Sequence, residues 1–161
     1  MERSTASLVQ VVLLAFWLGA AVFFGSVVAP ALFAVLPSRT LAGAVVGLTL
    51  PAILYSGMAV GAFVLVLQVA MRRGWRWKGR ELAALITIVA CGIAQFGVGP
   101  RIARLRTEIG GPIESLPFDD ARRVAFGRLH GISVAWLGLA MLAAFICGLI
   151  AARAVRRDTG A

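Results

Sequence analysis

The chain has 161 residues, of which 60% are hydrophobic and only 14% charged, and its mean hydropathy is +0.92. These values exclude an ordinary water-soluble domain, in which about 25% of the residues are charged. The 16 Lys and Arg residues outnumber the 7 Asp and Glu residues and give a formal net charge of +9. They flank apolar segments instead of forming one basic face, which favours membrane lipids over nucleic acid as the partner.

Four uncharged apolar segments follow one another along the chain, and each is long enough to cross a bilayer, which takes about 20 helical residues. None shows the charged face that a buried helix of a soluble bundle presents every turn or two. The predicted spans are 8–36, 40–71, 82–100 and 129–152. We therefore predict an all-α polytopic membrane protein, one domain over 1–161 that folds as an antiparallel bundle of four transmembrane helices.

The first two spans form a predicted helical hairpin. The first apolar run continues to Leu36, beyond the roughly 7 to 15 residues of a signal-peptide core, so we expect it to stay in the membrane. Pro30 removes a backbone donor and predicts a kink, as does Pro51 in the second span. The second span also carries small residues near four-residue spacing, which let other helices approach closely. These residues are Gly43, Gly47, Gly57 and Gly61.

The loop at 72–80 is rich in basic residues and contains Trp75 and Trp77, a composition typical of a cytoplasmic loop at the membrane interface. Four spans place both termini on the same side as this loop. Basic residues are slightly more numerous on that side than on the other. We therefore expect a multi-pass protein of the cell membrane, in bacteria the inner membrane, with both termini in the cytoplasm.

The third span ends near Pro100 and is followed by a polar extension, and 110–112, Gly-Gly-Pro, is the clearest break in the chain. The segment 115–126 has acidic residues first and arginines later, which is the order that the helix dipole favours. It predicts a short amphipathic surface helix between the third and fourth transmembrane helices.

A candidate ligand site lies near the junction of the third and fourth spans. His130 is the only histidine, and it opens the last span together with Ser133. Arg101 and Arg104 are one helical turn apart and could bind a phosphate or carboxylate together. The alternatives are an interfacial hydrogen bond for His130 and headgroup anchoring for the two arginines.

Gln95 and Tyr55 are among the few polar side chains within the spans. They could line a ligand pocket, and we include them in the candidate site. Interhelical hydrogen bonds of about 1 kcal/mol would also account for them without a ligand.

Other kinds of chemistry are not indicated by the sequence. It shows no nucleophile triad, paired carboxylates or phosphate-binding loop, so we expect no enzymatic activity and no cofactor. A lone histidine is a poor metal site, and Cys91 and Cys147 lie well inside spans, where packing is the expected role. We predict no buried acidic residue in any span, which argues against a proton-coupled pump.

The motifs Phe16-Trp17-Leu18-Gly19, Leu36-Pro37, Leu50-Pro51, Pro100-Arg101 and Leu129-His130-Gly131-Ile132-Ser133 stand out along nearly the whole chain. With them the chain resembles the transmembrane-protein-205-like family, also described as domain of unknown function 4149. The resemblance implies a compact four-helix membrane protein. An animal relative is associated with resistance to platinum drugs, which implies export or trafficking.

Two departures from known patterns limit what these resemblances imply. The family pattern has an Asn four residues after the Ser, where this chain has Leu137, so a polar site built on His130, Ser133 and that Asn is incomplete. The fold is also similar to the copper-resistance-D type of four-helix unit, but the Met and His clusters expected for copper are absent from the sequence.

Three hypotheses for function follow. The first is a transporter-like protein that binds a small polar or anionic ligand or a lipid near His130, and that would need to form a homo-oligomer to enclose a pathway. The second is a structural or assembly protein whose glycine-rich helix faces dock a membrane-protein partner or another copy. The third is a haem or metal protein that uses His130 as a ligand.

Overall fold

The computed structural model describes residues 2–71 and 79–158. Most of the basic loop at 72–80, with Trp75 and Trp77, lies outside these residues. Helices make up nearly all of the described chain, because backbone polar groups in a bilayer must be satisfied within the segment. The elements are α1 (Glu2–Phe23), η1 (Phe24–Val28), α2 (Ala29–Val35), α3 (Arg39–Met71), α4 (Gly79–Gly92), η2 (Ile93–Val98), α5 (Gly99–Ile109), η3 (Ile113–Ser115) and α6 (Ala121–Asp158).

Four continuous helical stretches are long and apolar enough to cross a membrane, which confirms the predicted all-α, four-span fold of a multi-pass membrane protein. These stretches are Ser4–Val35, Arg39–Met71, Gly79–Ile109 and Ala121–Arg157. The third and fourth are longer than predicted, because charged residues do not end a helix. The third ends at Gly110, whose φ of 63° is left-handed. The segment expected as a separate surface helix is in part the first turns of α6.

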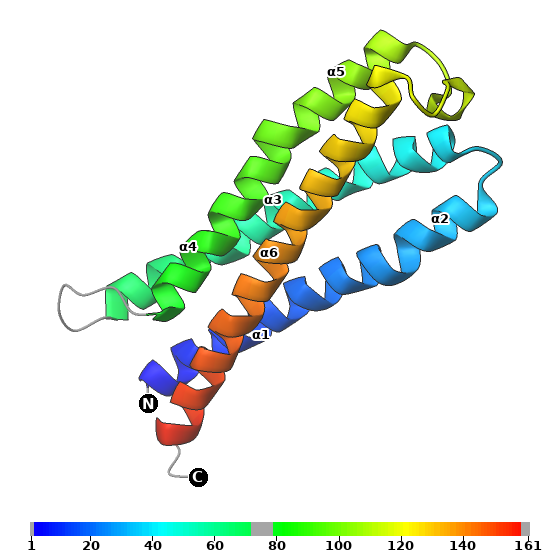
Figure 1. Cartoon of the computed structure of the whole chain (residues 1–161). Helices are drawn as coiled ribbons and strands as arrows, with labels where there is room; N and C mark the ends of the chain where they lie inside the picture. Colours follow the sequence, from blue (N-terminus) through cyan, green and yellow to red (C-terminus); the bar gives the residue numbers. More distant parts are fainter. Residues whose placement is uncertain (1, 72–78, 159–161) are drawn as a thin grey trace.

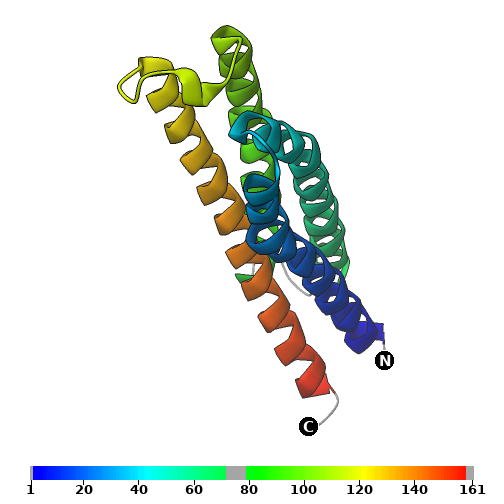
Figure 2. The ribbon, with the colours of Figure 1, turned by 90° about the vertical axis from the view of Figure 1, so that its right-hand side faces the viewer.

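The four spans form a ring in which α6 packs against α1 and α4, and α3 packs against α4 and α1. Helices that follow one another in the chain run in opposite directions, and both termini lie at the same end of the bundle (Figures 1 and 2). We call this the terminal end. The opposite end carries the connections between α2 and α3 and between α5 and α6 (Figure 1).

The closest helix contacts are made at glycines of α3. A Cβ at Gly57 would lie 2.6 Å from Trp17 Cζ2 and 2.8 Å from Cys91 Sγ, and a Cβ at Gly61 would lie 2.8 Å from Ile88 Cγ1. Trp17 is 2% exposed, and its Nε1 donates a hydrogen bond to Ile53 O at 2.9 Å. Trp17 therefore belongs to the core, and Gly57 and Gly61 of the predicted glycine face pack inside the bundle.

Two of the prolines follow short π-helical segments. η1 precedes Pro30 and η2 precedes Pro100, whereas α3 continues as an α-helix through Pro51. Proline has no N–H, and its ring clashes with the carbonyl group four residues earlier. A wider π-helical turn before the proline relieves this clash. In α1–α2 and in α4–α5, the helix thus changes geometry before it reaches the end opposite the termini.

The bundle is tightly packed toward the terminal end and open toward the other. α2 and α5 contain no buried residue. α2 packs on α3, and α5 packs on α6. In Figure 1, α2 diverges from α5 and α6 toward the end opposite the termini. The buried core therefore does not extend into α2 or α5.

Replacing Gly57 by alanine is expected to destabilise the protein, because its Cβ would overlap Trp17 and Cys91 and such overpacking costs about 1 to 3 kcal/mol. Gly138→Ala is the matched control, since nothing lies within 4 Å of a Cβ at that position. Thermal unfolding in detergent, followed by circular dichroism, should give a lower Tm for Gly57→Ala only. Equal Tm values for the two variants would contradict this packing.

Candidate functional site

α5 divides its basic residues between two faces. Its inner face is formed by the half-buried residues Ile102, Leu105, Arg106 and Ile109, which recur at helical spacing, whereas Arg101 and Arg104 are exposed on the outer face. Arg106 is therefore the arginine of α5 that points toward the other helices. Arg106 is not among the residues predicted from the sequence, although the helical spacing of Ile102, Leu105 and Ile109 is a signal that could have identified it.

Arg106 lies against the backbone of α3. Its Nη1 donates a hydrogen bond to Gly43 O at 3.0 Å. A Cβ at Gly43 would lie 2.7 Å from Nη2, and a Cβ at Gly47 would lie 3.1 Å from Nη1. These two glycines, which we predicted to receive a neighbouring helix, instead form a shallow notch that fits the guanidinium group.

The guanidinium of Arg106 also contacts α6. Its Cζ lies 5.4 Å from the centroid of the Phe126 ring. Phe126 in turn stacks on His130, with centroids 6.3 Å apart and an interplanar angle of 7°. Phe126 therefore contacts both Arg106 and the predicted candidate His130, whereas Arg101 and Arg104 make no such contact in the described residues.

Arg106 has no carboxylate partner among the described residues, where the observed ion pair joins Arg122 and Asp120. The contacts of Arg106 are a backbone carbonyl and an aromatic ring. A half-buried cation has lost part of its hydration and gains most from an anion that accepts charge-assisted hydrogen bonds. Nη2 and Nε of Arg106 have no acceptor in the described part of the chain. We define Arg106, Gly43, Gly47, Phe126 and His130 as the arginine site.

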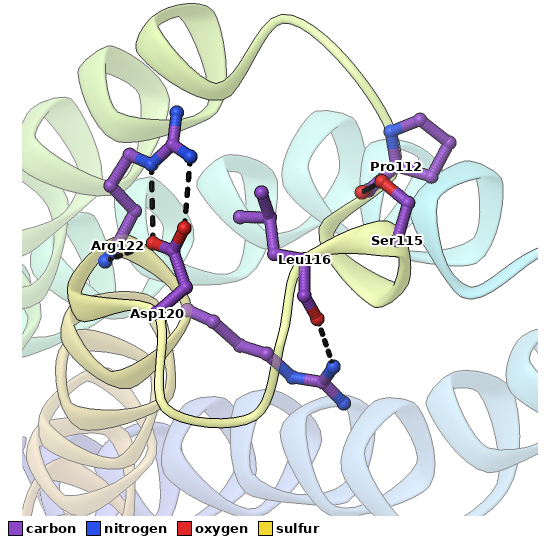
Figure 3. A network of polar contacts seen from close by, with 6 residues as sticks. Pro112, Ser115, Leu116, Asp120 and Arg122 are labelled. Carbon is purple, nitrogen blue, oxygen red and sulfur yellow. Dashed lines mark hydrogen bonds and ion pairs between the residues drawn. The ribbon is translucent and has the colours of Figure 1, made fainter.

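The start of α6 is capped by Asp120 (Figure 3). Its Oδ1 accepts a hydrogen bond from the backbone N–H of Arg122 at 2.8 Å, as expected of an N-cap. The Arg122 side chain pairs with the same carboxylate, through Nε at 3.2 Å and Nη2 at 2.9 Å. These hydrogen bonds and the charge of Arg122 lower the pKa of Asp120 from its ordinary 3.8 to about 2.

The connection between α5 and α6 also engages Arg123. Arg123 Nη1 donates to Leu116 O at 2.6 Å, and its Cζ lies 4.0 Å from the Phe118 centroid. Ser115 Oγ donates to Pro112 O at 2.7 Å, which closes the turn that precedes Leu116 (Figure 3). Arg123 is thus occupied by local contacts.

The same connection is tied to the start of α3. Thr40 Oγ1 donates to Glu114 Oε2 at 2.9 Å. The pKa of Glu114 is lowered, first by its own backbone N–H and then by hydrogen bonds from Thr40 and Arg39. Glu114 therefore serves this link and is not the partner of Arg106.

The remaining predicted residues are distributed over other places. Gln95 Nε2 donates to Tyr55 Oη at 3.3 Å, and Tyr55 makes an edge contact with Phe96 at 5.9 Å. Tyr55 lies eight positions beyond Gly47 on α3, about 12 Å along the helix, so this pair is separate from the arginine site. Ser133 is 7% exposed and lies one turn after His130 on α6.

The prediction that no acidic residue is buried in a span is wrong. Glu81 is 0% exposed and lies in the third candidate span. The predicted span began at residue 82 because Glu81 is charged, but α4 begins at Gly79 and faces Glu81 toward the core. Two glutamines that the sequence analysis did not single out as buried are also enclosed, Gln10 at 1% and Gln68 at 0% exposed.

The described residues contain no group of three or more His, Cys, Asp or Glu side chains that could hold a metal ion. His130 is exposed and has Phe126 as its ring neighbour. Cys91 and Cys147 are both buried as free thiols.

Comparison with protein families gives a match over residues 12–110 to a family described as domain of unknown function (DUF4149). The match covers more than half of the chain. It includes α3 and α5, and therefore Arg106, Gly43 and Gly47, whereas Phe126 and His130 lie beyond it. Comparisons with curated proteins and with solved structures give no match.

Removing the Asp120 carboxylate is expected to lower the Tm at pH 7 and to lower it much less at pH 2, where the carboxylate is half protonated in the folded state. Because the folded-state pKa is lowered, the carboxylate's contribution to stability is complete above its ordinary pKa of 3.8 and is lost as the pH falls through about 2. Thermal unfolding of Asp120→Ala and the wild type at both pH values measures this.

Asp119→Ala is the control for that experiment, because Asp119 is the exposed neighbouring acid and makes no polar contact in the described residues. A pH-dependent Tm difference of equal size for both variants would contradict the capping role of Asp120.

Proposed function

This chain belongs to the DUF4149 family, and we propose that it binds a phosphate-bearing anion at the arginine site, without catalysing a reaction. The observation that carries the proposal is Arg106, a half-buried cation held by a carbonyl oxygen and an aromatic ring, with no carboxylate partner in the described residues. An anion at this position would restore the charge-assisted hydrogen bonds that burial has removed.

The notch in α3 supports this role. Gly43 and Gly47 let the guanidinium lie against the helix backbone, and the hydrogen bond to Gly43 O fixes Nη1. A guanidinium that is held in place loses less side-chain freedom when it binds an oxyanion. Phe126, which contacts Arg106, also stacks on the His130 ring, so His130 lies on the same face of α6.

Arg101 and Arg104 have a supporting role in the proposal. Both are exposed on the outer face of α5, and neither has a hydrogen bond or ion pair in the described residues. They would attract anions to this end of the bundle and anchor α5 among lipid headgroups.

We place the protein in a bacterial inner membrane with both termini in the cytoplasm. The support is the common end of the two termini (Figure 2) and the basic composition of 72–80 on the same side. In this orientation the arginine site lies at the outer boundary of the membrane. Transport of the bound anion would extend this proposal, and it would require a pathway between copies of the chain.

Self-association is a second candidate function. The glycines that would support it are not those of α3, from which the sequence predicted a docking face. Gly43, Gly47, Gly57 and Gly61 all approach side chains within the chain. Three of the glycines with open space at the Cβ position lie on the exposed face of α6, at spacings that bring helices together in membranes. They are Gly127, Gly131 and Gly138, with nothing within 4 Å of a Cβ.

Arg106→Gln is expected to weaken phosphate binding at least about tenfold, which corresponds to loss of one charge-assisted hydrogen bond of about 1.5 kcal/mol. The full-length protein in mild detergent is titrated with phosphatidylglycerol and, separately, with inorganic phosphate, and binding is measured by native mass spectrometry. Binding of the lipid alone identifies a headgroup site, and binding of both identifies a site for free anions.

Arg153→Gln is the matched control, because it removes the same charge from an exposed position near the other end of α6. Arg106→Lys keeps the charge and should give intermediate binding. Equal binding by Arg106→Gln and the control would overturn the proposal. The same spectra report subunit stoichiometry, and a dimer that Gly131→Leu converts to monomers would favour the second candidate.

A further inference from the structure

A group of polar residues lies inside the bundle toward the terminal end. Gln68 Nε2 donates to Gln10 Oε1 at 3.1 Å and approaches Cys147 Sγ at 3.4 Å. Cys147 Sγ donates to Arg80 O at 3.4 Å. These four residues come from α1, α3, α4 and α6, so each span contributes one. We call them the polar layer.

The polar layer is enclosed. Gln10 is 1% exposed, and Gln68 and Cys147 are 0% exposed. Two further polar residues near it on the same helices are also buried, Ser7 at 5% and Glu81 at 0% exposed. In a bilayer, buried polar side chains are costly, and they either form hydrogen bonds between helices or mark functional sites.

Two buried atoms of the polar layer lack a hydrogen-bond partner in the described part of the chain. They are Gln68 Oε1, an acceptor, and Arg80 Nε, a donor. Both residues contact the Cys147 thiol, Gln68 through its amide nitrogen and Arg80 through its backbone carbonyl. The two atoms without a partner therefore belong to residues that are neighbours of this thiol. The assignment of amide oxygen and nitrogen does not change this result. If the two atoms were exchanged in both Gln10 and Gln68, one amide atom would still lack a partner.

We propose that the polar layer is a hydration site, at which water accepts a hydrogen bond from Arg80 Nε and donates one to Gln68 Oε1 beside the Cys147 thiol. Water satisfies a donor and an acceptor at once, whereas a metal cation would be repelled by the Arg80 guanidinium. Arg80 is half-buried although its Nε is buried, so its side chain connects the layer to the terminal end of the bundle.

The site is distinct from the arginine site, which lies toward the other end, and it does not depend on anion binding there. It gives the bundle a water-accessible interior next to the buried Glu81. Small hydrophilic molecules should therefore reach the Cys147 thiol, although the thiol is 0% exposed in the static structure.

Cys91 is the internal control. It is also 0% exposed, but its surroundings include the Trp17 ring at Gly57 and other apolar residues of the core. The chain has two cysteines, so Cys91→Ala leaves only Cys147 and Cys147→Ala leaves only Cys91. The two thiols are equally buried and differ in the polarity of what surrounds them.

The test uses the full-length single-cysteine variants in lipid nanodiscs. A small cationic methanethiosulfonate, which forms a mixed disulfide with a thiol and releases methanesulfinate, is followed by mass spectrometry. We expect Cys147 to react at least about ten times faster than Cys91, because water access controls the thiolate that reacts. Equal rates at the two cysteines would overturn the proposal.

Gln68→Leu in the Cys91→Ala background tests the assigned acceptor. It removes Gln68 Oε1 at similar volume and should slow labelling of Cys147 to the rate of Cys91. Its Tm and its labelling by the apolar reagent N-ethylmaleimide confirm that the variant is folded. An unchanged Cys147 rate with the methanethiosulfonate in this folded variant would show that Gln68 does not hold the water and would overturn the assignment.

Discussion

The contact of Trp17 with the α3 backbone at Gly57 sets the distance between α1 and α3, and the rest of the bundle depends on it. Lipid tails are as apolar as the core, so helices in a membrane associate through close packing and hydrogen bonds. The contact supplies both, because Gly57 has no Cβ to separate the helices and Trp17 Nε1 finds an acceptor at Ile53 O. Cys91 of α4 also packs against Gly57 at this contact.

Beyond this contact, the π-helical segments before Pro30 and Pro100 separate a packed half from an open half. In the open half, polar contacts hold the helices together, whereas apolar packing does so elsewhere. Arg106 joins α5 to α3 and α6, and Glu114 joins the connection before α6 to Thr40. A link made by a cation without a carboxylate leaves charge available for a ligand, which is why we place anion binding there.

The two ends of the bundle thus differ in chemistry. The arginine site is open, cationic and formed largely by residues within the part of the chain that matches the DUF4149 family. The polar layer is closed, and Gln68 and Cys147 bring the side chains of α3 and α6 together within it. Polar groups therefore lie toward both ends of the bundle, and most of the buried residues between them are apolar.

The amino-acid sequence by itself determined the four spans, their antiparallel order and the common side of the termini, because the exclusion of charge from a bilayer is a property of each segment alone. It also identified His130 and the glycines of α3 as noteworthy. Only the tertiary structure decided that Arg106 contacts Gly43 of α3 and Phe126 of α6, and that Glu81 is buried. Those outcomes depend on the rotation and pairing of helices, which contacts between residues far apart in the chain determine.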